Sequence, residues 1–378
     1  MKRENINLYI AALLIATIIF SFLTIFAFGE QREAAFSISA SSAVLYQPDN
    51  DILLFSKNCD QRMPMASTTK IMTALVAIEK GDFKDMVEID DSAIGTEGSS
   101  AYLKNGDVLT LEELLYALML QSANDAAVAI ACHIGGDIDG FSALMNEKAA
   151  ELKLTNTHFT NPHGLDNPEH YSTAKELAII AAEALKNPEF KKIVSTYKRT
   201  FSNETRVRTY VNHNKLLRLY DGCIGVKTGF TKKSGRCLVG AAEKDGLRFI
   251  SVTLDAPNDW ADHSKMLNFG YERLERLVLA EPFDHMYKIP LIDGERDCFI
   301  AANTEGGELI QEKSDSAIEE NIRLLRYGVA PINRGDVVGE IIYTSGGKEL
   351  MRVPIVATES VAKKKQSGFF DKILSIFD

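Results

Sequence analysis

Apolar and polar positions along the chain fall into sections of different period. Residues 35–54 contain short apolar runs with strand character, whereas most of Ser67–Leu185 follows the longer period of amphipathic helices. One apolar run begins at Thr110 with Glu113 three residues later, a pairing typical of a helix start. The pattern therefore predicts strands followed by several helices.

Strand character returns over Val211–Leu254, where short apolar runs alternate with turn residues. A helix over His263–Leu279 is expected to close this unit. Because strands stand on both sides of the helical section, we expect one α+β domain over residues 35–280, with a sheet built from both ends of the segment.

Beyond residue 280 the pattern changes. Runs such as Tyr287–Leu291 and Val338–Thr344 alternate with turns such as Gly346-Gly347. Short strands separated by turn residues predict a small all-β domain over residues 281–360.

Residues 363–378 have a pattern of their own. After the lysines at 363–365, apolar residues recur at the spacing of one helix face, namely Phe369, Phe370, Ile373, Leu374 and Phe377. Three phenylalanines beside a lysine cluster favour an amphipathic helix that lies on a membrane surface. Packing of the same helix against the protein is the alternative.

Residues 1–29 are expected to direct export. Lys2 and Arg3 precede an apolar run, Leu8–Phe28, that ends in small residues, which is the layout of a cleavable signal peptide. The run is also long enough to remain as a membrane anchor. Cleavage is the favoured outcome, and either outcome delivers the rest of the chain across a membrane.

Composition narrows the function classes. The net charge of −10 argues against a nucleic-acid binder, and the sequence has neither a phosphate-binding glycine loop nor a metal-ligand spacing. The five cysteines are scattered. Cys223 and Cys237 flank an expected turn near Phe230 and could face each other, although separate buried thiols are the favoured interpretation.

Candidate chemistry begins at Ser67 and Lys70, which are neighbours on a helix because they are three residues apart. A serine hydroxyl needs an adjacent base to act as a nucleophile. Lysine can be that base only when its amine is neutral, a state that burial or a second nearby cation favours by lowering the pKa. Lys227, at the end of a predicted strand in Lys227-Thr228-Gly229, is the candidate second cation.

A third element, Ser122-Ala123-Asn124, follows an apolar helix. Each short motif recurs by chance, but Ser-x-x-Lys, Ser-x-Asn and Lys-Thr-Gly in this order are typical of penicillin-binding proteins and class A β-lactamases. Ala123 stands where the usual second motif has aspartate, and only the flanking side chains need to reach a site.

On these motifs, and on the stretches NPHGLDNPEHYSTAKELAIIAAEAL and DGCIGVKTGFTKKSGRCLVGAA, the chain resembles the D-alanyl-D-alanine carboxypeptidases, the low-molecular-mass penicillin-binding proteins. The resemblance implies an α+β, β-lactamase/transpeptidase-like domain, with a five-stranded antiparallel sheet flanked by helices, and a small all-β domain that lifts the site above the membrane. It implies a serine carboxypeptidase on the extracytoplasmic face of the cytoplasmic membrane. The implied substrates are peptidoglycan stem peptides ending in D-Ala-D-Ala, with β-lactam antibiotics as covalent inhibitors and with no metal or organic cofactor.

The resemblance also implies catalytic roles for three residues. Ser67 would be the nucleophile that the penultimate D-Ala carbonyl acylates, and Lys70 would be the general base that takes its proton. Ser122 would relay a proton toward the departing D-Ala amine.

Substrate binding is implied for a second set of residues, namely Asn124, Lys227, Thr228, Gly229 and Phe230. Asn124 would bond the peptide backbone and Lys70, Lys227 would hold Ser122, and Thr228 would bind the terminal carboxylate. The strand from Lys227 to Phe230 would pair with the substrate, and the backbone N–H groups of Ser67 and Phe230 would form the oxyanion hole.

Two positions differ from some relatives and lie near the substrate in the family: His213, where they have arginine, and Phe230, where they have a polar residue or histidine. His163 is interpreted as a loop-organising residue, because a lysine already supplies the base. The alternatives are a class A β-lactamase, a D,D-endopeptidase and a non-catalytic cell-wall scaffold.

Overall fold

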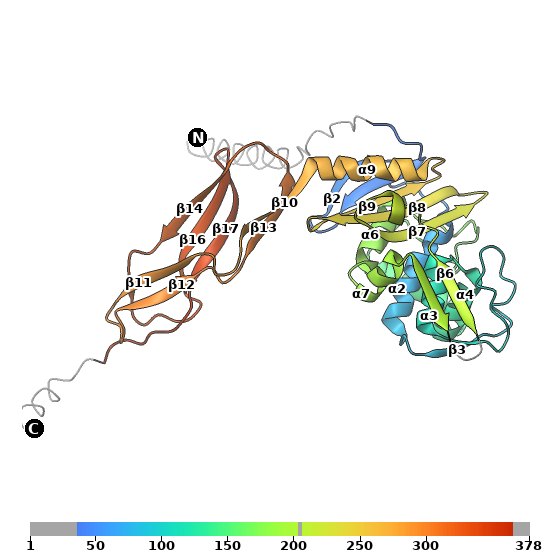
Figure 1. Ribbon diagram of the computed structural model, residues 1–378, viewed down its shortest axis with the longest axis horizontal. Helices are drawn as coiled ribbons and strands as arrows, with labels where there is room; N and C mark the ends of the chain where they lie inside the picture. The colour runs from blue at the N-terminus through green and yellow to red at the C-terminus, as the bar shows by residue number, and fades with distance from the viewer. Residues whose placement is uncertain (1–35, 203–205, 366–378) are drawn as a thin grey trace, which may run out of the picture.

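The structure is a computed structural model that describes residues 36–202 and 206–365. Figure 1 shows an N-terminal domain built on one sheet and a smaller β-rich domain beside it. The predicted signal peptide and residues 366–378 of the predicted tail helix lie outside the described residues.

The N-terminal domain is organised around a five-stranded antiparallel sheet with the order β2-β1-β9-β8-β7. Its strands are β1 (Ser42–Gln47), β2 (Ile52–Lys57), β7 (Cys223–Thr231), β8 (Gly235–Lys244) and β9 (Leu247–Leu254). The first two come from one end of the segment and the other three from the opposite end, which confirms the predicted sheet.

Alternating side chains of β1 separate the two faces of this sheet. Ala43 and Leu45 belong to one apolar cluster, which includes Met266 of helix α9 (Asp259–Arg273), whereas Val44 and Tyr46 belong to the other. Because successive strand residues point to opposite faces, both faces are covered by packed elements. Figure 1 shows α9 on one side and α2, α6 and α7 on the other.

The larger apolar cluster lies in the helical layer. Its main elements are the 3-10 turn η1 (Ala66–Thr69), α2 (Lys70–Lys80), α3 (Leu111–Leu120), α4 (Asn124–Gly135), α5 (Ile138–Glu151), α6 (Ala174–Ala184) and α7 (Pro188–Ser195). The short helix α8 (Leu216–Leu219) and two antiparallel strand pairs complete the domain, namely β3 (Met86–Glu88) with β4 (Val108–Thr110) and β5 (Lys198–Ser202) with β6 (Val207–Val211).

Thr110 caps α3 as the sequence predicts, because its hydroxyl accepts from the N–H of Glu113 at 3.1 Å. The carboxylate of Glu113 does not close a capping box. It bonds instead to Arg206 and Tyr210 of the neighbouring hairpin segment.

Among the described residues, no single helix is long and apolar enough to cross a bilayer. Helices α4 and α5 meet this length and composition only when they are taken together, across a bend of 82°.

The helix predicted over His263–Leu279 is wrong at both ends. Helix α9 begins at Asp259 and ends at Arg273, and the next residues form strand β10 (Leu274–Ala280), which pairs with β13 (Gly307–Glu312). The segment Leu274–Ala280, with five apolar residues among seven, suits either a helix or a strand, and pairing with β13 selects the strand.

The second domain has the predicted all-β character. A sheet with the order β14-β16-β17-β12-β11-β15 shares a core with Ala280 of β10. Its strands are β11 (Met286–Ile292), β12 (Cys298–Ala302), β14 (Ile318–Leu324), β15 (Gly328–Val329), β16 (Val337–Ser345) and β17 (Lys348–Ala357). Gly346 and Gly347 form the turn between β16 and β17 at positive φ.

Cys223 and Cys237 do not face each other. The register places Cys223 opposite Ala242 and Cys237 opposite Gly229, and a register shift follows Cys223. All five cysteines are free thiols, as the favoured interpretation expects, but only Cys237 is buried and the other four are partly exposed.

Asp262 ties the first described residues to α9. Its buried carboxylate accepts from the N–H groups of Ser39 and Ala40, at 2.9 and 3.1 Å, and from the Ser39 hydroxyl at 2.7 Å. We expect Asp262→Ala to lower the free energy of unfolding by about 2–3 kcal/mol, since several donors lose their acceptor. Denaturant unfolding measures the change. Glu272→Ala, at an exposed position of the same helix, is the control, and equal effects of the two substitutions would contradict the assignment.

Candidate active site

Ser67 lies in the turn η1 immediately before α2, and Lys70 is the first residue of α2. The Ser67 side chain is half-buried, whereas Lys70 is completely buried. The turn is unusual because Ala66 has a φ of 48°, in the left-handed region that side chains disfavour. Hydroxyls of Thr68 and Thr69 hold it by donating to the carbonyls of Met65 and Ala66.

The amine of Lys70 has three close oxygen neighbours. Its Nζ lies 3.0 Å from Ser67 Oγ, 2.7 Å from Asn124 Oδ1 and 2.6 Å from the carbonyl of His163. These groups come from η1, the start of α4 and the loop before α6. The structure thus brings together the serine, lysine and asparagine that the motifs single out.

The three oxygens around Nζ accommodate an ammonium group, which has three N–H donors, and also a neutral amine. A neutral amine has two N–H donors and one lone pair, and the oxygens of Asn124 and His163 can only accept. The Asn124 orientation is fixed because its Nδ2 donates to the Glu97 carbonyl. In the neutral form both donors are used by these two oxygens, which leaves the lone pair to accept the hydroxyl proton of Ser67; in the protonated form the third N–H donates to Ser67 Oγ.

Two causes lower the pKa of Lys70 well below its ordinary value. Burial is the larger, and the positive charge of Lys227 is the second, while Asp125 acts in the opposite direction. Burial likewise lowers the pKa of Lys227 to about 7. Lys227 therefore lies close enough to act as the second cation that the sequence predicts.

One predicted contact of Lys227 is different in the structure. Within the described part of the chain, its Nζ hydrogen-bonds to the carbonyl of Thr228, at 2.9 Å, rather than to Ser122. Lys227 thus influences the site through its charge in this structure.

Ser122 sits in the connection between α3 and α4 with a φ of 61°. It is buried but lines the same cavity as Ser67. A serine in the left-handed region costs backbone energy that the surrounding packing must offset, and such residues cluster at functional sites.

Asp125, which the sequence analysis did not single out, fixes the loop over this site. Its carboxylate accepts from the N–H groups of Ala101 and Leu103, at 2.9 and 3.1 Å, and from Ser100 Oγ at 2.6 Å. The Asn124 N–H donates to the Ser99 carbonyl at 2.7 Å. In the sequence, the position of Asp125 next to Asn124 of the second motif was the only signal that could have indicated this role.

His163 organises its loop, in agreement with its interpretation. Its Nδ1 accepts from the Leu165 N–H at 3.2 Å, and burial lowers the pKa of the ring to about 4. The next residue, Gly164, has a φ of 88°, and a Cβ there would lie 2.0 Å from the Ala66 carbonyl oxygen. Glycine thus lets the loop approach η1 closely enough for the His163 carbonyl to reach Lys70.

Strand β7 forms the opposite wall, at the free edge of the sheet. A Cβ on Gly229 would lie 3.0 Å from the Ser67 nitrogen, so the strand runs directly past the serine. Thr228, Gly229 and Phe230 line a cavity of about 360 Å³ together with Ser67 and Ser122. The three remote motifs therefore meet around one open cavity.

Comparisons with known proteins agree with this arrangement. Residues 29–258 match the D-alanyl-D-alanine carboxypeptidase family of peptidases, and residues 286–363 match the C-terminal domain of penicillin-binding protein 5. The chain belongs to the D-alanyl-D-alanine carboxypeptidase family.

The similarity to individual relatives covers most of the chain. It is 33% identical over 350 residues to the D-alanyl-D-alanine carboxypeptidase DacF of Bacillus subtilis, covering 90% of this chain and 89% of that protein. Penicillin-binding protein 5 from Haemophilus influenzae is similar in structure, with a TM-score of 0.64, 29% identity and coverage of 87% and 99%. The carboxypeptidase DacD from Francisella tularensis gives a TM-score of 0.63 at 26% identity, with coverage of 88% and 96%.

This member of the family has further residues in its cavity that the motifs do not reveal. Arg236 belongs to β8 and lies opposite Phe230 of β7. Its guanidinium donates to both carboxylate oxygens of Asp259 at 2.9 Å and lies over the ring of Trp260. His213 also lines the cavity, and the Phe230 side chain is 66% exposed at its rim. Periodicity gave no signal for Asp259 or Trp260, because the helix they begin was predicted to start later.

The depressed pKa of Lys227 has a consequence for stability. The pKa of the Lys227 amine falls from 10.5 in the unfolded chain to about 7 in the folded protein. Between these two pH values the unfolded chain binds more protons than the folded protein, so the free energy of unfolding rises with pH. We expect Lys227→Met to raise the free energy of unfolding most below pH 7, with a gain that declines toward pH 10.5. Denaturant midpoints across this range test the sign, and a gain that grows with pH would contradict it.

Proposed function

We propose that the protein is a serine-type D-Ala-D-Ala carboxypeptidase that removes the terminal D-alanine from peptidoglycan stem peptides through an acyl-enzyme on Ser67. The placement of the buried Lys70 amine, 3.0 Å from Ser67 Oγ and with its pKa held well below the ordinary value by burial and by Lys227, is the observation that carries this proposal. Membership of the family supplies the reaction class.

Acylation begins when Lys70 takes the proton of Ser67 and the oxygen attacks the carbonyl of the penultimate D-alanine. The N–H groups of Ser67 and Phe230 would stabilise the oxyanion, and losing such a donor typically costs about 10²–10³ in rate. The close approach of Gly229 to the Ser67 nitrogen supports this pairing, since it brings β7 beside the serine.

Collapse of the intermediate breaks the bond between that carbonyl carbon and the nitrogen of the last D-alanine. Ser122 passes the proton to the departing amine, and Thr228 holds the carboxylate of the same residue. The charge of Lys227 supports both steps. Asn124 orients the peptide and Lys70 together, because its amide already bonds to the amine.

Deacylation reverses the roles. A water molecule gives its proton to the base and attacks the ester carbonyl, and Ser67 recovers its hydroxyl proton as the shortened peptide leaves. A β-lactam that resembles the D-Ala-D-Ala end would acylate Ser67 by ring opening, and its retained leaving group would slow the second step.

The proposed location is the extracytoplasmic face of the cytoplasmic membrane. Its support is the leader over residues 1–29 and the amphipathic pattern over residues 363–378. Of that tail, Lys363 and Lys364 are held against the turn after β11, by a bridge to Gly294 and a hydrogen bond to Asp293.

The nucleophile is tested by substitution. We expect the purified protein to form a persistent adduct with a fluorescent penicillin and to release D-alanine from a D-Ala-D-Ala stem peptide, and Ser67→Ala to abolish both. Ser195→Ala, at the exposed end of α7, should change neither. Rapid turnover of the penicillin would indicate a β-lactamase, and labelling that survives in Ser67→Ala would refute the assignment.

The pH dependence tests the base. Acylation should fall as the pH drops, because protonated Lys70 has no lone pair for Ser67. Removing a neighbouring cation raises the pKa of Lys70, so in Lys227→Gln the fall in acylation rate should occur at higher pH. The permanently charged Lys227→Arg should not move it upward. Rates of penicillin acylation give both profiles, and an upward shift in both variants would contradict the electrostatic role.

A further inference from the structure

Large apolar side chains gather at one end of the C-terminal domain. We define the distal apolar surface as five residues that are 47–68% exposed, namely Ile292, Leu325, Tyr327, Val329 and Val337. Ile292 ends β11, Val329 belongs to β15 and Val337 begins β16, whereas Leu325 and Tyr327 lie in the connection between β14 and β15. Isolated exposed apolar residues are ordinary, whereas a contiguous group marks an interaction site.

Backbone pairing brings four of these residues together in two pairs, and the short chain segment 325–329 connects the pairs. Ile292 lies opposite Val329 in the parallel pair of β11 and β15. The Leu325 N–H donates to the Val338 carbonyl at 2.9 Å, which places Leu325 beside the start of β16 at Val337. Tyr327 immediately precedes β15.

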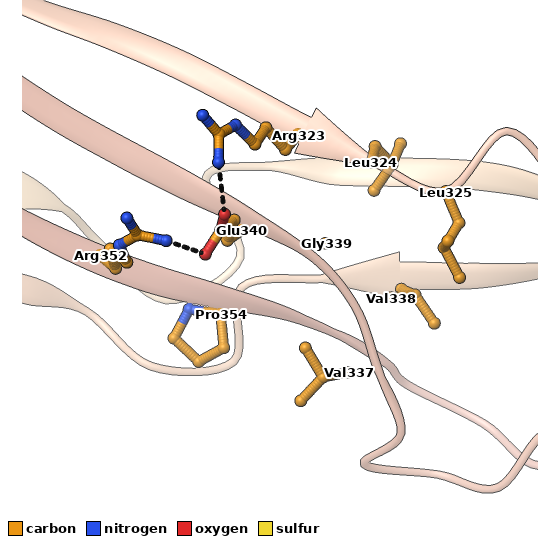
Figure 2. A pocket seen from close by; sticks show the side chains of 9 residues that line it. All are labelled: Arg323, Leu324, Leu325, Val337, Val338, Gly339, Glu340, Arg352 and Pro354. Atoms are coloured by element: carbon orange, nitrogen blue, oxygen red, sulfur yellow. Dashed lines mark hydrogen bonds and ion pairs between the residues drawn. The ribbon is translucent and has the colours of Figure 1, made fainter. Parts of the chain in front are cut away.

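The surface continues into an apolar hollow of about 470 Å³. Figure 2 shows Leu325, Val337, Val338 and Pro354 around it. Glu340, paired with Arg323 and Arg352, lies at its charged end. Because these charged groups pair with one another, the apolar side chains remain as the unpaired part of the lining.

The chain leaves the described structure at the same end. The β-bridges that join Val361 to Ile332 and Lys363 to Gly294, with the hydrogen bond from Lys364 to Asp293, fasten the last described segment beside the surface. Figure 1 shows this end facing away from the N-terminal domain. Residues 366–378, with the apolar pattern described above, therefore start next to the distal apolar surface.

Charges around the surface are close to balanced. Cations without an ion pair in the described structure are Arg326, Arg334, Lys363, Lys364 and Lys365, and carboxylates without one are Asp293, Glu295, Asp297 and Asp336. Electrostatic attraction alone is therefore weak, and any association must come chiefly from the apolar side chains.

We propose that the distal apolar surface is a second membrane contact, which enters the interfacial layer of a phospholipid bilayer beside the tail. Tyrosine is enriched at this depth, and the aliphatic residues around Tyr327 gain from leaving water. The exposed lysines next to the surface suit the anionic headgroups nearest the chain's exit. The inference rests on the proposed membrane location and is independent of the chemistry at Ser67.

Contact at both the tail and the domain fixes the orientation of the molecule. A single flexible attachment would let the C-terminal domain tilt freely, whereas two adjacent contacts hold its distal end against the bilayer. The domain then projects the cavity at Ser67 away from the lipid, because the N-terminal domain lies at the opposite end.

The single tryptophan of the chain makes a depth measurement possible. Trp260 lies at the cavity of the N-terminal domain. In Tyr327→Trp, we expect vesicles of brominated phosphatidylcholine and phosphatidylglycerol to quench the added emission at position 327 and to leave Trp260 unquenched. Val207→Trp, at an exposed N-terminal-domain position, is the matched control and should stay unquenched. Vesicle binding without quenching at position 327 would overturn the proposal, because the tail alone would then hold the protein.

A partition measurement tests the energetic contribution. We expect the full-length double variant Leu325→Ser/Val337→Ser to bind vesicles about tenfold more weakly, since two apolar side chains no longer leave water. Val207→Ser/Leu219→Ser, with exposed apolar residues of the N-terminal domain, should bind like the unaltered chain. Release of D-alanine in solution should be unchanged in both. Unaltered partition, or a dimer that the first double variant alone abolishes, would overturn the proposal.

Discussion

The buried amine of Lys70 is the constraint on which the site depends. An amine removed from water retains its proton poorly, and its N–H groups still require acceptors. Asn124 and the His163 carbonyl meet that requirement and thereby bring the start of α4 and the loop before α6 to the base of η1. The contacts that satisfy the buried amine, and that the proposed base role needs, therefore also join three elements of the domain.

Close approach at this point needs unusual backbone. Ala66 and Ser122 adopt positive φ, and Gly164 does so where a side chain would collide with the Ala66 carbonyl. Such conformations persist only where surrounding structure offsets their cost. The Asp125 bonds to the loop at 100–103 supply part of that support. The strained backbone around the candidate site therefore lowers the stability of the N-terminal domain, as is common at the active sites of enzymes.

The sheet places the site at its open edge and joins the site to the second domain. Strand β7 is the edge strand beside Ser67, so its outer side is free to receive an extended peptide. On the outer face of the same sheet, α9 leads directly into β10, which is already part of the C-terminal domain through β13. The cavity and the distal apolar surface consequently lie at opposite ends of one continuous structure.

The sequence by itself determined the two-domain organisation and the three motifs, whereas the antiparallel arrangement of the five strands was expected from the resemblance to the family. Periodicity follows from which residues must be buried, and the roles proposed for Ser67, Lys70 and Lys227 follow from what a serine nucleophile needs. It did not determine contacts made by backbone atoms, such as the His163 carbonyl on Lys70, because a carbonyl has no residue-specific signature.

Tertiary structure also decided elements whose local pattern is ambiguous. Leu274–Ala280 became a strand because β13 was available to pair with it. The turn between β7 and β8 lies after Thr231 and not near Phe230, so Cys223 lies opposite Ala242 instead of Cys237. The carboxylate of Glu113, at a spacing from Thr110 that also permits a capping box, bonds instead to Arg206 and Tyr210, which lie far along the chain. In each case a remote partner outweighed the local preference, since packing energies exceed the small differences between local conformations.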